Sequence, residues 1–216
     1  MIKNTEELID SLSRDLSPVR PLRNPLIRTA LWVAVLVPYT ALVIIVMGFL
    51  LKRPIAALDR PFLMEQMFAL ATGITAAMAA FTSVIPGRNG SYLLWPVLPL
   101  IGWLGTLGES CLAAVPLAIT GHNLWCFPFV IILGTAPAIM LWKMLSRGAP
   151  LTPGVTAGLG ALAAAGIGNF CVRLIHQEDV TIMLLFWHVG GVFLLSILSG
   201  AAGRYLLNWR SLDRTS

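Results

Sequence analysis

The stretch LIRTALWVAVLVPYTALVIIVMGFLL, residues 26–51, carries one charged side chain, that of Arg28. An α-helix rises about 1.5 Å per residue, so about 20 apolar residues cross the hydrocarbon core of a bilayer. The stretch is long enough to span a membrane and too long for the apolar region of a signal peptide. Residues 1–25 before it are polar and contain Pro18, Pro21 and Pro25. We therefore expect a first membrane-spanning helix and no cleaved leader.

Further apolar runs of similar length follow along the chain. They are Leu63 to Ile85, Tyr92 to Val115, Trp125 to Leu145, Gly154 to Ile175, and Ile182 to Leu207. Together with the first run they predict an all-α integral membrane bundle of six transmembrane helices. The predicted organisation is a cytoplasmic N-terminal segment at 1–25, the six-helix transmembrane domain at 26–210, and a cytoplasmic C-terminal tail at 211–216.

The composition supports this class of protein. Hydrophobic residues make up 57% of the 216-residue chain and charged residues 12%, with a mean hydropathy of +0.81. Soluble domains are about 45–50% apolar and about 25% charged, so the numbers exclude a soluble globular or a disordered chain. The formal net charge of +5 does not indicate nucleic-acid binding, because basic residues at the ends of membrane helices set orientation.

The Lys and Arg residues predict that orientation. With six spans both termini lie on one side, which holds eleven of these residues: Lys3, Arg14, Arg20, Arg23, Arg28, Arg88, Lys143, Arg147, Arg204, Arg210 and Arg214. The other side holds four: Lys52, Arg53, Arg60 and Arg173. Because cytoplasmic loops carry the excess of positive charge, both termini are predicted to be cytoplasmic in a bacterial inner membrane.

Small residues four apart occur in the last two runs: Gly154 with Gly158, Ala164 with Gly168, Ser196 with Gly200, and Ser199 with Gly203. Small side chains let membrane helices approach closely. The pattern fits packing within one chain and dimerisation equally, so a homo-oligomer is left open. Prolines inside the runs, at positions 38, 96, 99, 116 and 137, would kink or end helices. A bundle tolerates them when neighbouring helices bond the freed carbonyls.

Charged groups that could carry chemistry are scarce in the spans. Glu65 and Glu109 lie near the predicted outer ends of their helices, where we interpret them as carboxylates at the membrane interface. No paired carboxylates, phosphate-binding loop, zinc-protease motif or serine-hydrolase motif occurs, so no enzymatic function is expected. Two alternatives remain: a membrane thiol oxidoreductase that reduces quinone, and a small transporter subunit, which would need a polar path at mid-membrane.

The cysteines and two histidines gather at the predicted outer ends of the helices. Cys111 lies late in the third run, and His122 and Cys126 are four apart where the fourth begins. Cys171 lies at the end of the fifth run, and His176 follows in the outer loop. Disulfides persist in the oxidising periplasm. Three interpretations stay open for Cys126, Cys171, His122 and His176: a Cys126–Cys171 disulfide, a soft-metal site with two thiolates and two imidazoles, or ordinary buried thiols and interfacial histidines.

The N-terminal segment has the pattern of a short amphipathic helix. Asn4 and Glu7 form a capping box, and the apolar side chains Leu8, Ile9, Leu12 and Leu16 recur at helical spacing. About 13 residues is too short for a helix that is stable alone in water. Residues 1–16 carry a net charge of −2, with Glu6, Glu7, Asp10 and Asp15 against Lys3 and Arg14. An acidic amphipathic helix favours a basic protein partner over anionic lipid.

Several short runs resemble the negative-regulator-of-sigma-F family of bacterial inner-membrane anti-sigma factors, and the similarity extends over essentially the whole chain. They are Leu8-Ile9-Asp10, the run from Asp15 to Arg23 (DLSPVRPLR), Val84-Ile85-Pro86-Gly87-Arg88, Trp125-Cys126, Arg147-Gly148-Ala149-Pro150-Leu151 and Leu185-Phe186-Trp187-His188.

The resemblance implies a concrete function. The N-terminal segment would hold an extracytoplasmic-function sigma factor at the membrane, without direct contact to nucleic acid. A periplasmic heavy-metal or oxidative signal would release the sigma factor in a stress response. The resemblance implies that Cys126 and Cys171 form the sensing pair, and it assigns no role to Cys111. Glu6, Glu7, Leu8, Ile9, Asp10, Leu12, Asp15 and Leu16 are then the expected partner-binding residues.

Overall fold

The computed structural model describes residues 5–14, 22–51, 59–114, 126–148, 150–175 and 190–206, and within these ranges the chain is all-α without a strand. This confirms the predicted fold class. The elements are α1 (Thr5–Arg14), α2 (Pro25–Leu51), α3 (Arg60–Ser83), the 3₁₀-helix η1 (Gly90–Leu94), α4 (Val97–Ala114), α5 (Cys126–Leu145), α6 (Pro153–Ile175) and α8 (Gly190–Leu206).

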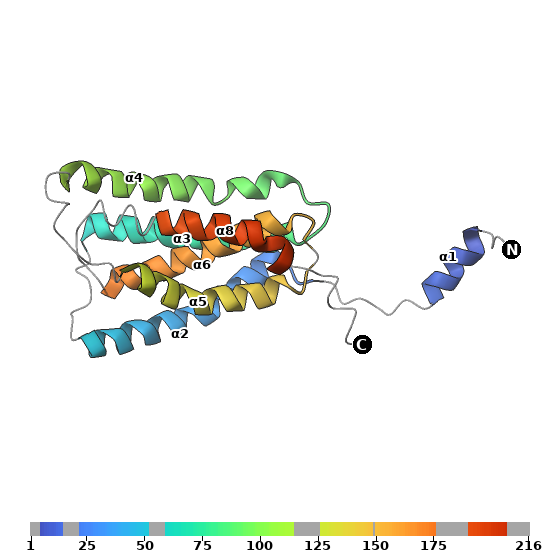
Figure 1. Cartoon of the computed structure of the whole chain (residues 1–216), viewed down its shortest axis with the longest axis horizontal. Coiled ribbons are helices and arrows are strands. Elements are labelled where there is room, and N and C mark those ends of the chain that lie inside the picture. Colours follow the sequence, from blue (N-terminus) through green and yellow to red (C-terminus); the bar gives the residue numbers. More distant parts are fainter. Residues whose placement is uncertain are drawn as a thin grey trace.

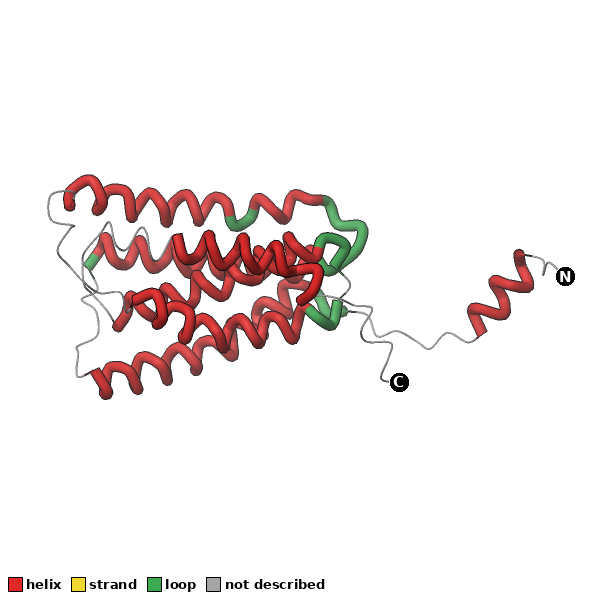
Figure 2. The backbone as a smooth tube through the Cα atoms, viewed as in Figure 1, coloured by secondary structure: helices red, strands yellow, loops and turns green. Residues whose placement is uncertain are grey.

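Six long helices run side by side in a bundle, with α1 apart from them (Figure 1). We call the end of the bundle that faces α1 the near end; α2, α4 and α6 begin there, and α3, α5 and α8 end there. The opposite end is the far end. Helix α6 is central and packs against α8, α3 and α5, while α4 packs on the outside of α3. Figure 2 shows the described turns mostly at the near end.

The small side chains of α6 explain its central place. A Cβ added to Gly166 would lie 3.2 Å from the Ala69 carbonyl oxygen of α3, and one added to Gly154 would lie 2.8 Å from the Gly200 carbonyl oxygen of α8. These backbones therefore touch where a larger residue would separate them. The small-residue pattern predicted from the sequence is used here for packing within one chain.

A proline in α5 is accommodated as expected. Pro137 lies inside the helix and has no backbone N–H to donate to the carbonyl of Leu133, four residues earlier. The Tyr39 hydroxyl of α2 donates to that Leu133 oxygen at 2.8 Å. Trp32 Nε1 donates to the Pro137 oxygen at 3.2 Å. A neighbouring helix thus satisfies the carbonyl that the proline leaves without its helical donor.

Two predicted helix starts are corrected by local chemistry. The second run begins at Arg60 rather than Leu63, because the Asp59 carboxylate accepts a hydrogen bond from the Phe62 N–H and caps the helix. The third run does not start as one helix at Tyr92. Pro96 cannot donate to the Tyr92 carbonyl, so a short 3₁₀ turn ends before it and α4 starts at Val97.

Among the described residues, three helical segments are long and apolar enough to cross a membrane, where six spans were expected. They are Pro25–Phe49, Arg60–Ser83 and Pro153–Leu174. A shorter apolar segment, Ile132–Leu145, lies within α5. The described part of the sixth predicted span begins at Gly190 and has 17 residues, and residues 182–189 lie outside the described part of the chain. The all-helical bundle is therefore shown, and six crossings are not.

Candidate functional site

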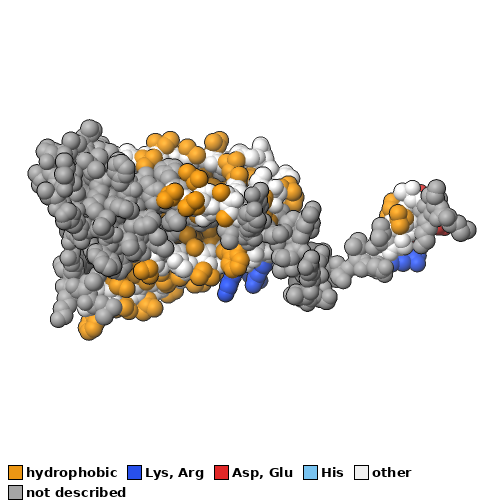
Figure 3. Space-filling view, viewed as in Figure 1, with side chains coloured by type: hydrophobic (Ala, Val, Ile, Leu, Met, Phe, Trp, Pro, Cys, Tyr) orange, Lys and Arg blue, Asp and Glu red, His pale blue; other side chains and the backbone are white. Residues whose placement is uncertain are grey.

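Helix α1 presents exposed apolar and acidic side chains. Leu8 is 47% and Ile9 is 60% exposed, and the acidic residues Glu6, Glu7 and Asp10 are exposed as well. Figure 3 shows α1 away from the bundle, with its hydrophobic atoms open to the surroundings. The structure thus places five of the predicted partner-binding residues on one accessible helix.

The rest of the predicted N-terminal pattern is not tested. Asn4, Asp15 and Leu16 lie outside the described residues, and so does the side chain of Leu12. In the described helix, the Ser11 and Ser13 hydroxyls donate to the Leu8 and Asp10 carbonyls. The described part of the helix runs from Thr5 to Arg14.

Cys171 lies on the far half of α6 and is a free thiol, completely buried in the core of the bundle. Its Sγ donates to Thr40 Oγ1 of α2 at 3.8 Å. The contact is informative because α2 is the helix that follows the N-terminal segment in the chain. Any displacement of the Cys171 side chain would therefore alter its contact with α2.

The other members of the predicted cysteine and histidine cluster are placed only in part. Cys126 is the first residue of α5 and Cys111 lies in the last turn of α4, so both backbones are at the far end. Their side chains, and the whole of His122 and His176, lie outside the described residues. The residues that the structure does describe contain no cluster of three or more His, Cys, Asp or Glu that could hold a metal ion.

An ion pair that was not predicted from the sequence lies at the far end. Arg173 Nε donates to Glu65 Oε1 at 3.0 Å, and Arg173 Nη2 donates to Glu65 Oε2 at 2.9 Å. The guanidinium also lies 5.7 Å from the centroid of the Phe62 ring. Glu65 is buried and paired inside the bundle, and its place at the membrane interface stays a prediction. The signal in the sequence was one acid and one base at the same predicted end of two helices.

A second buried cation lies at the near end. Arg28 is 5% exposed, and its guanidinium sits 4.5 Å from the centroid of the Phe81 ring. Its Nη2 donates to the Met144 carbonyl in the last turn of α5, while Nη1 is buried without a hydrogen-bond partner. Arginine near a helix C-terminus stabilises the carbonyl end of the helix dipole. Arg28 is thus a packed residue of the bundle.

Comparisons with known proteins identify the family of this chain. A profile of the family described as "Negative regulator of sigma F" matches residues 12–209. The anti-sigma-F factor NrsF of Caulobacter vibrioides (strain NA1000 / CB15N) is 27% identical over 95% of this chain and 99% of its own length. No solved structure matches. Because the profile covers nearly the whole chain, the protein belongs to the negative regulator of sigma F family.

Proposed function

We propose that this chain is a membrane-bound anti-sigma factor that sequesters an extracytoplasmic-function sigma factor through α1. The observation that carries the proposal is the exposed acidic amphipathic helix, attached by a short segment to an apolar bundle. Leu8 and Ile9 would pack on the sigma factor, and Glu6, Glu7 and Asp10 would face the basic surface with which it binds DNA. Leu12, Asp15 and Leu16 continue the same pattern in the sequence.

We further propose that α2, α3, α4, α5, α6 and α8 cross the bacterial inner membrane with both termini in the cytoplasm. Helix α2 supports the proposal, because its apolar side chains face outward: Val37 is 63%, Ile45 68% and Phe49 83% exposed. Soluble proteins rarely expose contiguous apolar surface of this kind. Arg23, Arg88, Lys143 and Arg147 lie toward the near end, which would be the cytoplasmic end.

The signal is proposed to act at Cys126 and Cys171, at the periplasmic end of the bundle. Two forms fit: binding of a soft metal ion by the thiolates, with His122 and His176 as further ligands, or oxidation of the two thiols to a disulfide. The oxidation passes two electrons and two protons to a periplasmic thiol oxidant. Either event would pull Cys171 away from Thr40 and favour a second arrangement of α2.

Co-purification tests the partner-binding part. The full chain is expressed in bacterial membranes with the sigma factor encoded beside it, and compared with a chain lacking residues 1–17 and with the Leu8→Asp variant. Ser13→Asp is the matched control, because it adds the same charge three residues from Asp10, on the acidic side of α1. The sigma factor should follow the full chain and the control. Retention by both the truncated chain and Leu8→Asp would refute the proposal.

The signal is tested separately. Release of the sigma factor by cadmium or by a thiol oxidant is measured in the Cys126→Ser/Cys171→Ser variant, with Cys111→Ser as the matched control. We expect the double variant to retain the sigma factor and the control to release it. A double variant that responds normally would remove the thiols from the mechanism and leave sequestration by α1 intact.

A further inference from the structure

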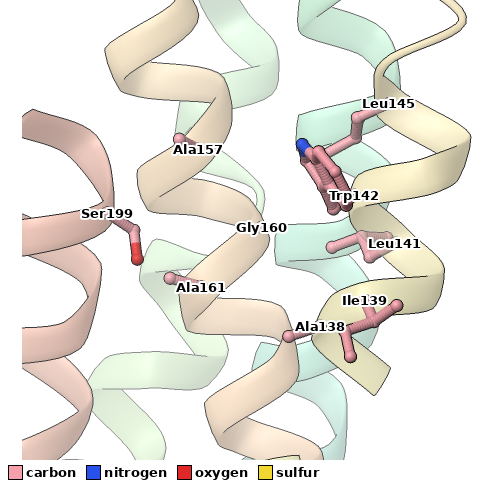
Figure 4. A pocket seen from close by; sticks show the side chains of 9 residues that line it. All are labelled: Ala138, Ile139, Leu141, Trp142, Leu145, Ala157, Gly160, Ala161 and Ser199. Atoms are coloured by element: carbon pink, nitrogen blue, oxygen red, sulfur yellow. The ribbon is translucent and has the colours of Figure 1, made fainter. Parts of the chain in front are cut away.

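An apolar groove lies between α5, α6 and α8, toward the near end of the bundle. It has a volume of about 240 Å³. Leu141, Trp142 and Leu145 extend from α5 toward α6, and Ser199 reaches toward the groove from α8 (Figure 4). Its floor is formed by small residues of α6, among them Gly160. Ala157, Gly160 and Ala161 thus line the groove, while Gly154 and Gly166 make the close backbone contacts of α6.

Basic side chains stand at the near end of this groove. Lys143 follows Trp142 directly and lies one helical turn after the groove residue Ile139, so the two share a face of α5. Arg147 comes two residues after Leu145, and both Lys143 and Arg147 are exposed. Figure 3 shows Lys and Arg side chains beside the hydrophobic surface of the bundle. A slender molecule with an apolar chain and an anionic head would match this arrangement.

The described segments of the near end carry exposed positive charge without acidic residues beside it. No Asp or Glu occurs in the described segments of the near end, 22–40, 84–96 and 138–153. The exposed Lys143 and Arg147 therefore attract an anionic group to this end of the groove.

The charge beside the groove favours a lipid over a second copy of the chain, because the exposed Lys143 and Arg147 attract an anionic headgroup. Trp142, 46% exposed at the edge of the groove, is a residue type enriched where acyl chains meet headgroups.

We propose that the groove between α5, α6 and α8 binds an anionic phospholipid, with an acyl chain along Trp142 and Gly160 and the phosphate beside Lys143 and Arg147. The inference rests on the proposed membrane placement. It adds a specific lipid site at the cytoplasmic end of the helix whose other end carries Cys126. Basic pockets between membrane helices on the cytoplasmic side are suited to such headgroups.

The test uses the full chain, purified in a neutral detergent with its sigma factor. Thermal unfolding is followed while phosphatidylglycerol, phosphatidylcholine or inorganic phosphate is added. We expect phosphatidylglycerol to raise the melting temperature, and the other two to have little effect. The Lys143→Gln/Arg147→Gln variant should weaken phosphatidylglycerol binding by about tenfold or more. Ala161→Phe, which fills the groove, should abolish the effect of phosphatidylglycerol on the melting temperature. Arg88→Gln is the matched control at the same end and should behave as the original chain.

Three outcomes would overturn the lipid site: equal stabilisation by the two lipids, an equal effect of inorganic phosphate, or an unchanged response in the double variant. An Ala161→Phe variant that changes from dimer to monomer without any lipid dependence would show that a second copy fills the groove. Retention of the sigma factor is measured in the same samples. If it persists while the lipid response is absent, only the lipid site fails, and if the chain is absent from the membrane fraction, the proposed membrane placement fails.

Discussion

Glu65 of α3 and Arg173 of α6 form a buried, bidentate ion pair across 108 positions of sequence, with N–O distances of 3.0 and 2.9 Å. The two residues lie at the far end of the bundle, and Arg173 follows Cys171 by two positions on α6. The pair therefore fixes the position of the helix end that carries the proposed sensor thiol.

Replacing one residue of this ion pair should lower the stability of the protein. Glu65→Gln leaves the Arg173 guanidinium buried without its counter-charge, and removal of one member of a buried pair costs about 3–5 kcal/mol. We expect a large drop in the melting temperature, measured by thermal unfolding in detergent. The double variant Glu65→Leu/Arg173→Leu removes both charges, so its melting temperature should be much closer to that of the original chain. Equal losses in the single and double variants would show that the pairing itself does not matter.

The hydrogen bond from Tyr39 to Leu133 should depend on Pro137. Tyr39→Phe leaves the Leu133 carbonyl without a donor, at a cost of about 1–3 kcal/mol for a buried group. Pro137→Ala restores a backbone N–H for that carbonyl, so Tyr39→Phe should cost less in the Pro137→Ala chain. Stability measurements on the two single variants and the double variant give the coupling directly. Additive effects would contradict the proposed role of the tyrosine hydroxyl.

Because α6 packs closely on α8, replacing Gly154 by alanine should destabilise the bundle, which is the opposite of the usual effect of this substitution in a helix. Gly to Ala inside a helix usually stabilises it by about 1 kcal/mol, yet a Cβ at Gly154 would lie 2.8 Å from the Gly200 oxygen. Gly154→Ala should therefore destabilise the bundle by about 1–3 kcal/mol through overpacking. Gly105→Ala is the control, because nothing lies within 4 Å of its added Cβ, and it should be neutral or stabilising. The readout is the melting temperature of each variant.

Because Cys171 is buried, its thiol should react slowly with a reagent in solution. In a Cys111→Ser/Cys126→Ser background, Cys171 should react with a maleimide far more slowly than a cysteine placed at the exposed Ser91, because the reagent needs a local opening of the bundle. Mass spectrometry of samples quenched over time gives both rates. Labelling in denaturant should be rapid and complete for both cysteines. Equal rates in the native protein would mean that the Cys171 site opens freely.

Local pattern was enough for most of the helices and for the amphipathic character of α1. The periodicity of Leu8 and Ile9 with the acidic residues around them predicted α1, because side chains three and four apart share a helix face whatever else the chain does. Hydropathy located both ends of α2, α5 and α6 within one residue, and the predicted start of the sixth run lies outside the described residues. It failed at Arg60 and at Val97, where the cap by Asp59 and the missing N–H of Pro96 moved the starts.

The sequence alone therefore determined the fold class, the approximate order of the helices and the amphipathic character of α1, since these depend on neighbours along the chain. The tertiary structure decided the rest. Arg28 was one of many basic residues in the sequence, and only packing placed it on Phe81 and on the carbonyl end of α5. Glu65 and Arg173 became partners, and Tyr39 the donor to Leu133, because the bundle brings together residues about a hundred positions apart. Pairings of that kind depend on which helix faces meet. Hydrophobic runs of similar composition do not determine this, because it depends on the shapes of the packed side chains and on the hydrogen bonds of the few buried polar groups.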